Sequence, residues 1–174
     1  ALNGEAPLKE TLAAAMLAAA GWQGRAEDGP LFDPFCGAGT IAIEAAQIAC
    51  GIAPGGNRRF AFERLMPWRA HQTAWREMRE AARARVHASA VPIFAGDVSF
   101  RMTDFATRNA ERAGVAGAIE FKTSDALQRT PPAPRGTMVL NPPYGERIDA
   151  KGSGRQAIEG SGTPAEFFAT LTSH

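Results

Sequence analysis

The stretch Leu31-Phe32-Asp33-Pro34-Phe35-Cys36-Gly37-Ala38-Gly39-Thr40 decides the fold of this 174-residue chain. Its first three residues form a short, mainly apolar run that ends on an acid, as expected of a short buried strand. The segment Gly37 to Gly39 predicts a tight turn, because glycine adopts backbone conformations that other residues avoid. Residues 40–49 then have the pattern of a helix, which Gly51 closes. Strand, glycine turn and helix in this order predict the opening unit of an α/β sheet.

Further strands and helices are predicted on both sides of this unit. The strands are short apolar runs, at 93–95, 119–122 and 137–140, and the helices lie at 7–20, 67–86, 101–113 and 164–172. Strands alternate with helices four times, so the sheet should be mostly parallel, with helices on both faces. Length and composition fit one domain over residues 1–174, with an insertion at 52–91 and a mobile Gly/Ser-rich loop at 145–162.

Composition limits the class of protein. The apolar fraction of 45% and charged fraction of 21% are typical of a globular domain, and the sequence contains neither a membrane-span pattern nor a signal peptide. Cys36 and Cys50 are too few for a disulfide framework and lack the partners of a zinc site. We therefore expect structural cysteines, a reducing cytoplasmic compartment and no metal.

The insertion is rich in arginine. Eight of the sixteen arginines lie between Arg58 and Arg85, where only Glu63, Glu77 and Glu80 oppose them. Such a patch fits contact with phosphate and fits a solvated helix face equally well. Trp68 and Trp75 lie seven residues apart on one predicted helix stripe, which favours core packing over base stacking.

Three acids follow three successive predicted strands. Asp33 ends the first, Asp97 the second, and Asp125 comes just after the third. The carboxyl ends of parallel strands meet at one edge of a sheet, where α/β proteins bind ligands. Each acid alone is at least as easily a cap or turn residue, but three together favour a nucleoside site.

Asn141-Pro142-Pro143-Tyr144 follows the fourth predicted strand. The two prolines fix φ and make the turn stiff. The turn offers a carboxamide, two proline carbonyls and an aromatic ring, and it carries no acid, thiol or metal ligand. These groups are suited to binding a planar amino group, such as that of a nucleobase.

These motifs carry a family resemblance. The segment 33–40 resembles the first motif of class I S-adenosylmethionine-dependent methyltransferases, and 141–144 resembles their amino-group methylating signature. With Ile43-Glu44-Ala45-Ala46 and the Arg108 to Gly114 segment, residues 2–148 are similar to the THUMP-associated RNA guanine-N2 methyltransferases, above all to those of large-subunit (23S) rRNA. The implied fold is the Rossmann-like class I methyltransferase sheet.

The resemblance also implies a donor, an acceptor and their residues. S-adenosylmethionine would be the cofactor, with Asp97 at its ribose and Asp125 at its adenine, and RNA would be the partner. Asn141, Pro142 and Tyr144 would be the catalytic residues that hold the target base. The implied cofactor-binding positions are Asp33, Phe35, Gly37, Gly39, Thr40, Asp97, Asp125 and Asn141.

The sequence departs from the family pattern in two ways. Nothing in it corresponds to a THUMP domain, and only four of the family's seven strands are found, so the C-terminal strands are expected to be missing. We therefore expect a domain of a longer protein that binds S-adenosylmethionine weakly and methylates RNA poorly alone. A tRNA or DNA amino methyltransferase acting on adenine N6 or cytosine N4, and a non-catalytic RNA-binding fragment, remain alternatives.

Overall fold

The structure is a computed structural model that describes residues 8–56 and 58–142. Tyr144, the predicted loop at 145–162 and the predicted helix at 164–172 lie outside these ranges. The described helices are α1 (Glu10–Ala19), α2 (Thr40–Ala49), α3 (Gln72–Arg83) and α4 (Phe100–Ala113), and the strands are β1 (Leu31–Asp33), β2 (Ile93–Asp97), β3 (Ile119–Thr123) and β4 (Thr137–Met138). Short 3-10 helices lie at Ala26–Asp28, Ala61–Arg64, Met66–His71 and Ala116–Ala118.

The four strands form one parallel sheet with the order β3-β2-β1-β4. The parallel sheet predicted from the alternation of strands and helices is thereby confirmed. The fourth strand is shorter than the predicted 137–140, since Met138 is its last residue. The ladder still reaches one residue further, because the Val139 amide donates a hydrogen bond to the Phe32 carbonyl at 3.1 Å.

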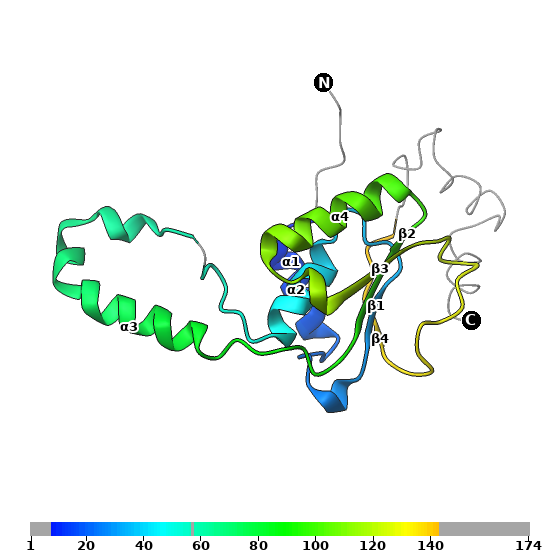
Figure 1. The fold of residues 1–174 in the computed structure, drawn as a ribbon, viewed down its shortest axis with the longest axis horizontal. Helices are drawn as coiled ribbons and strands as arrows, with labels where there is room; N and C mark the ends of the chain where they lie inside the picture. Colours follow the sequence, from blue (N-terminus) through cyan, green and yellow to red (C-terminus); the bar gives the residue numbers. More distant parts are fainter. Residues whose placement is uncertain (1–7, 57, 143–174) are drawn as a thin grey trace, which may run out of the picture.

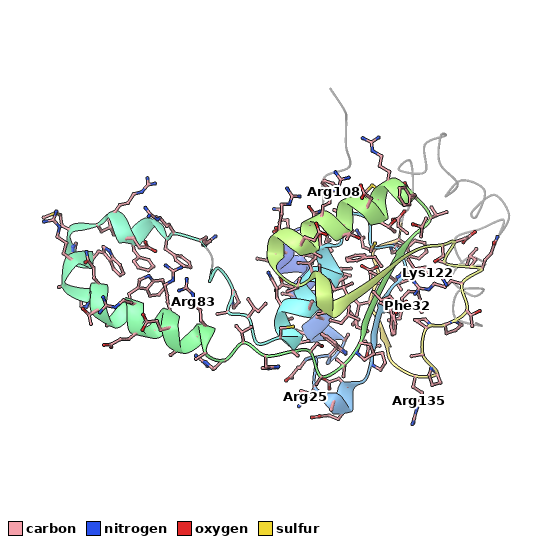
Figure 2. All side chains as sticks on the ribbon, in the orientation of Figure 1. Arg25, Phe32, Arg83, Arg108, Lys122 and Arg135 are labelled. Carbon is pink, nitrogen blue, oxygen red and sulfur yellow. The ribbon has the colours of Figure 1, made fainter. Side chains whose placement is uncertain are left out.

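Strand alternation separates the two faces of the sheet. Leu31, Ile93 and Ala95 are at most 1% exposed, and they form one core with α1, α2 and α4. These three helices lie together on one face of the sheet (Figure 1). Phe32 is half-buried and points to the other face (Figure 2). Helices on the Phe32 face of the sheet, which the sequence also predicts, stay a prediction.

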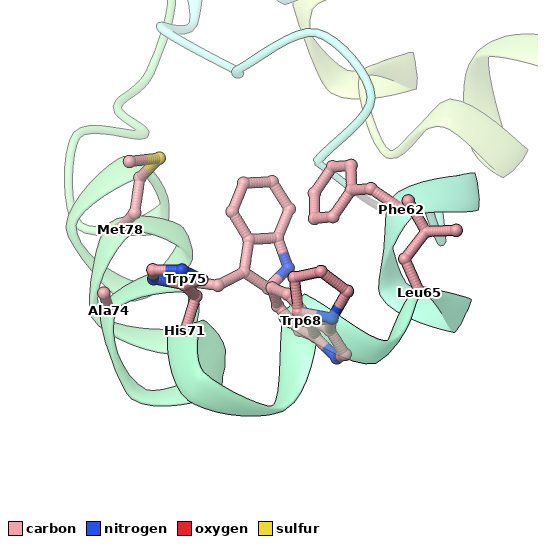
Figure 3. Close-up of a pocket in the computed structure, with 8 residues that line it drawn as sticks. Phe62, Leu65, Trp68, His71, Ala74, Trp75 and Met78 are labelled. Atoms are coloured by element: carbon pink, nitrogen blue, oxygen red, sulfur yellow. The ribbon is translucent and has the colours of Figure 1, made fainter.

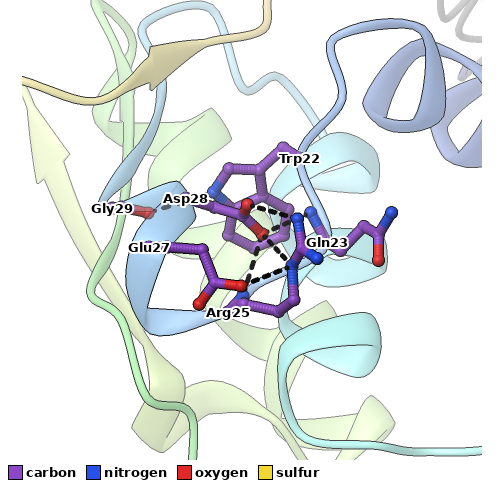
Figure 4. Close-up of polar contacts among 6 residues, drawn as sticks. All are labelled: Trp22, Gln23, Arg25, Glu27, Asp28 and Gly29. Carbon is purple, nitrogen blue, oxygen red and sulfur yellow. Dashed lines mark hydrogen bonds and ion pairs between the residues drawn. The ribbon is translucent and has the colours of Figure 1, made fainter.

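A short loop between α1 and β1 is closed by Asp28 (Figure 4). The Asp28 carboxylate accepts hydrogen bonds from the Gln23 and Arg25 amides and from the Arg25 guanidinium. These bonds favour the charged form and lower the pKa of Asp28 to about 2. The indole of Trp22 donates to the Gly29 carbonyl at 3.1 Å, which satisfies the polar atom of a buried core residue.

The insertion forms an arm, residues 52–87, which projects from the sheet domain (Figure 1). The helix predicted at 67–86 is only partly correct, because Met66–His71 is a 3-10 helix and α3 runs from Gln72 to Arg83. The His87 amide donates to the Cys50 carbonyl at 3.0 Å, so the arm returns to the place where it leaves α2. Because the two ends of the arm meet at Cys50 and His87, the segment between them packs against itself.

The core position predicted for Trp68 and Trp75 is therefore wrong. Neither belongs to the apolar core of the sheet domain. Their rings pack against each other at 6.1 Å between centroids and against Phe62 at 5.4 and 5.1 Å. The two tryptophans stabilise a separate aromatic cluster within the arm.

We predict that Gly39→Ala destabilises the protein more than Gly37→Ala. Both glycines have positive φ, +85° and +50°, which disfavours alanine. A Cβ at Gly39 would also lie 3.0 Å from the Ala106 Cβ, whereas a Cβ at Gly37 would meet nothing within 4 Å. Urea denaturation should show a loss of about 2–4 kcal/mol for Gly39→Ala and about 1–2 kcal/mol for Gly37→Ala. Equal losses would contradict the close packing of Gly39 on α4.

Candidate active site

The parallel sheet brings the sequence-predicted acids and the proline turn to one edge. Across the strand order, the residues at or just after the carboxyl ends are Asp125, Asp97, Asp33 and Asn141. The chain passes outward from β1 to β2 and β3 and then returns to the other side of β1 to form β4. The strand order thus reverses between β1 and β4, which is where α/β sheets bind their ligands.

The glycine turn is fixed by contacts with distant parts of the chain. The Gly37 amide donates to the Asp97 carboxylate at 3.1 Å, and the Cys36 amide donates to the Gly96 carbonyl at 2.7 Å. The Asn109 side chain, on α4, donates to the Ala38 carbonyl at 2.8 Å. The turn is therefore held by β2 and by α4, and its shape is set before any ligand binds.

The turn leaves room for a ligand. Apart from the two neighbours of Gly37 in the chain, no described residue has an atom within 4 Å of a Cβ built on this glycine. Helix α2 begins at Thr40, and its N-cap residue, Gly39, has no side chain that could cap the first turn. Amide groups at such a helix start favour a negative or polar group. A ligand can thus approach the backbone closely at this point of the edge.

Asp33 is a buried carboxyl group beneath the turn. It is 1% exposed, its Oδ1 accepts from the Phe35 amide at 3.2 Å, and its Oδ2 has no hydrogen-bond partner among the described residues. Burial, helped by the nearby charge of Asp97, raises the pKa of Asp33 to about 7. An orphaned buried carboxylate oxygen favours a cationic or hydrogen-donating ligand group beside it.

Asp97 and Asp125 lie where the strand pattern predicted. Asp97 Oδ1 accepts from the Ser99 amide at 2.9 Å, and Asp125 Oδ1 accepts from the Leu127 amide at 2.9 Å. The Ser124 amide donates to the Asp97 carbonyl at 3.0 Å, which ties the two strand ends together. Both carboxylates thus also organise their own turns.

Asn141 and Pro142 are half-buried and follow β4 next to the β1 end. Pro143 and Tyr144 lie outside the described residues. Asn141 follows β4 at the same sheet edge as Asp33, and its role stays a prediction.

Both cysteines are free and buried. Burial raises the pKa of the Cys36 thiol far above its usual range, which makes this sulfur a poor nucleophile despite its place in the turn. In the described ranges, no group of three His, Cys, Asp or Glu side chains is placed to hold a metal ion. Within the same residues, no helix combines the length and apolar character that crossing a membrane requires.

Arg129 is a feature of this region that the sequence did not reveal. Its side chain is only 4% exposed, and its guanidinium lies over the Phe32 ring at 4.9 Å. A Cβ at Gly96 would lie 3.0 Å from Arg129 Nη1, so the guanidinium packs closely over this glycine. No motif surrounds Arg129, and only the tertiary structure shows that it is buried.

Comparison with known proteins places the chain in a family. Residues 1–161 match the family model described as the RMKL-like methyltransferase domain. The chain belongs to this family. The RMKL-like assignment confirms the family and the Rossmann-like fold expected from the motifs at 33–40 and 141–144.

Relatives of the RMKL-like domain include a ribosomal RNA large subunit methyltransferase K/L from Shewanella baltica, which is 52% identical over 152 residues. That match covers 84% of this chain and 21% of the relative, so the chain spans about a fifth of the relative's length. Among solved structures, SMU.472, a putative methyltransferase complexed with SAH, is 34% identical with a TM-score of 0.77, covering 97% of this chain and 43% of that one. A predicted N6-adenine-specific DNA methylase from Listeria monocytogenes is 33% identical with a TM-score of 0.75, covering 98% and 41%.

We predict a pH dependence of stability that Asp33→Asn removes. With a folded pKa of about 7 against an ordinary value of 3.8, folded Asp33 keeps its proton where the unfolded chain has lost it. Stability should therefore fall as pH rises from about 4 to about 7. Urea midpoints of the ligand-free protein between pH 4 and 8 should show this decline, and Asp33→Asn should flatten it.

Asp104→Asn provides a matched control, because the Asp104 side chain is 43% exposed and its carboxylate pairs with Arg108 on α4. Its pH profile should run parallel to that of the wild type. Parallel profiles for Asp33→Asn as well would contradict the raised pKa.

Proposed function

We propose that the protein transfers a methyl group from S-adenosylmethionine to the exocyclic N2 amino group of a guanine in RNA, with large-subunit rRNA as the substrate. The observation that carries the proposal is the alignment of Asp125, Asp97, Asp33 and Asn141 along one sheet edge beside the glycine turn. The family assignment and the relative named for rRNA methylation support the reaction class and the substrate.

Three features of the chain fit the donor. The Asp33 Oδ2 atom is buried without a partner among the described residues, which suits the cationic methionine end of S-adenosylmethionine. The open space over Gly37 allows close approach to the backbone. Asp97 and Asp125, at the ends of β2 and β3, are placed to accept from ribose hydroxyls and from the adenine amino group. The solved relative complexed with SAH supports this assignment. Phe35 and Thr40 complete the proposed donor site.

The acceptor residues need only orient and polarise the amine. The donor supplies an electrophilic methyl group on a sulfonium. The reaction barrier therefore arises mainly from aligning the amine nitrogen with the methyl carbon and from the delocalisation of the nitrogen lone pair into the ring. The Asn141 carboxamide oxygen and the Pro142 carbonyl are proposed to accept the two amine hydrogens, which favours a more nucleophilic nitrogen. Tyr144 is proposed to stack on the extruded base. No general base of raised pKa is needed.

One specific observation keeps a second function open. The solved relative described as a predicted N6-adenine-specific DNA methylase shares the fold at 33% identity, and an Asn-Pro-Pro-Tyr turn suits adenine N6 as well as guanine N2. For the full protein we propose a cytoplasmic location and a THUMP-like domain that helps to bind RNA. Assays on rRNA, tRNA and DNA, followed by identification of the modified nucleoside, separate these substrates.

We predict that Asn141→Ala in the full-length protein lowers methyl transfer by about 10²–10³-fold while S-adenosylhomocysteine still binds. The reason is the loss of one acceptor aimed at charge that develops only in the transition state. Tritium transfer to rRNA measures the rate, and calorimetry measures binding. Undiminished transfer would exclude the catalytic role of Asn141.

We predict that Asp97→Ala weakens donor binding by about 10–100-fold. The variant loses an ionised acceptor and also releases the Gly37 amide, to which Asp97 is bonded at 3.1 Å. Calorimetry with S-adenosylmethionine provides the measurement, and Asp104→Ala serves as the surface control. Equal affinity in wild type and Asp97→Ala would remove Asp97 from the donor site.

A further inference from the structure

The arm carries a positive charge that the rest of the chain does not share. Between residues 58 and 85, eight arginines face three glutamates, a formal charge of +5, whereas the whole chain carries +1. The rest of the chain, outside residues 58–85, therefore carries a formal charge of −4. In the described part of the chain, no arm arginine forms an ion pair with an acid. This excess is not neutralised within the described structure.

Most of these arginines are also available to a partner. Arg79 donates to the Gly56 carbonyl at 2.9 Å, and Arg58 lies over the Phe60 ring at 4.7 Å. Arg76, Arg79 and Arg83 follow one another at helical spacing along α3, so they line one side of the helix. Figure 2 shows Arg83 at the surface of the arm. The remaining six are exposed, and their side chains make no hydrogen bond or ion pair among the described residues: Arg59, Arg64, Arg69, Arg76, Arg83 and Arg85.

The same arm also carries an apolar groove (Figure 3). It is formed where the 3-10 helices meet α3, and its lining includes Phe62, Leu65, Trp68, Trp75 and Met78. Leu65 and Met78 are 59% and 62% exposed, although both are large apolar side chains. The Trp75 indole N–H is buried and has no acceptor among the described residues. The groove thus has apolar surface and aromatic edges without a described occupant.

We propose that the arm binds single-stranded RNA, with phosphates on the arginines and unstacked bases in the aromatic groove. Arginines beside aromatic rings are the combination that binds a flexible polyanion carrying planar bases. An apolar protein partner would remove water from the same arginines and would offer no acidic side chains to pair with them. This loss of hydration disfavours such a partner. The inference rests on the proposed RNA substrate and adds a second contact region, separate from the sheet edge that holds Asp33 and Asn141.

The test compares RNA affinity of full-length variants matched in charge. The double variant Arg76→Gln/Arg83→Gln removes two arm charges, and Lys9→Gln/Arg135→Gln removes two exposed charges elsewhere. Fluorescence anisotropy with a labelled single-stranded RNA at several salt concentrations gives the affinity and its salt slope. The arm variant should bind at least about 10-fold more weakly, with a slope shallower by about 1.4. The control should change neither quantity by a comparable amount.

A third variant separates base contacts from charge. Met78→Gln alters an exposed groove residue and should preserve the fold of the arm. It should weaken RNA binding several-fold and leave the salt slope unchanged. Ultraviolet crosslinking of the wild-type complex should place RNA on peptides from residues 58–86. S-adenosylhomocysteine affinity, measured in parallel, should be the same for all variants.

The outcomes distinguish the inference from the function on which it rests. If the wild type methylates RNA and the arm and control variants bind RNA equally, the arm inference fails and the methyltransferase proposal stands. If the Met78→Cys thiol is shielded from labelling in the RNA-free protein, another part of the protein or a second copy occupies the groove, and the inference also fails. If the wild type binds S-adenosylhomocysteine but neither binds nor methylates RNA, both proposals fail.

Discussion

The hydrogen bond from the Gly37 amide to the Asp97 carboxylate, 3.1 Å long, joins residues 60 positions apart and organises the candidate site. It exists because β1 and β2 are parallel neighbours, which brings their carboxyl ends together. The same carboxylate accepts from Ser99, at the start of α4, and α4 in turn holds the glycine turn through Asn109. Turn, strand end and helix therefore form one connected unit, and a change in any of them alters the proposed donor site.

The burial of Asp33 beneath the glycine turn lowers the stability of the ligand-free fold. A carboxyl group with one unpartnered oxygen beneath the turn destabilises the ligand-free fold once it is ionised. A cationic ligand group would offset that cost, so donor binding and stability should be linked. Cys36 lies in the same turn but contributes packing, because its thiol is buried with a raised pKa.

The arm differs from the sheet domain in how it is stabilised. The sheet domain has an alanine-rich core, in which α2 and α4 approach the strands closely through residues such as Ala45, Ala46 and Ala106. The arm has a cluster of four aromatic rings, Phe60, Phe62, Trp68 and Trp75, with centroids 5.1–6.1 Å apart. Stacked and edge-to-face contacts between these rings stabilise the small arm apart from the core of the sheet domain.

The sequence by itself determined the local elements and the candidate residues. The run Leu31 to Thr40 specified strand, turn and helix start, because apolar pattern and glycine conformation are properties of neighbouring residues. Only the tertiary structure decided what depends on distant contacts. It placed the rings of Trp68 and Trp75 in an aromatic cluster apart from the core of the sheet domain, because both ends of the insertion meet at Cys50 and His87. The tertiary structure also buries Arg129 over the Phe32 ring. It raises the pKa of Asp33, because the residues that remove water from this carboxyl group are far apart in the chain.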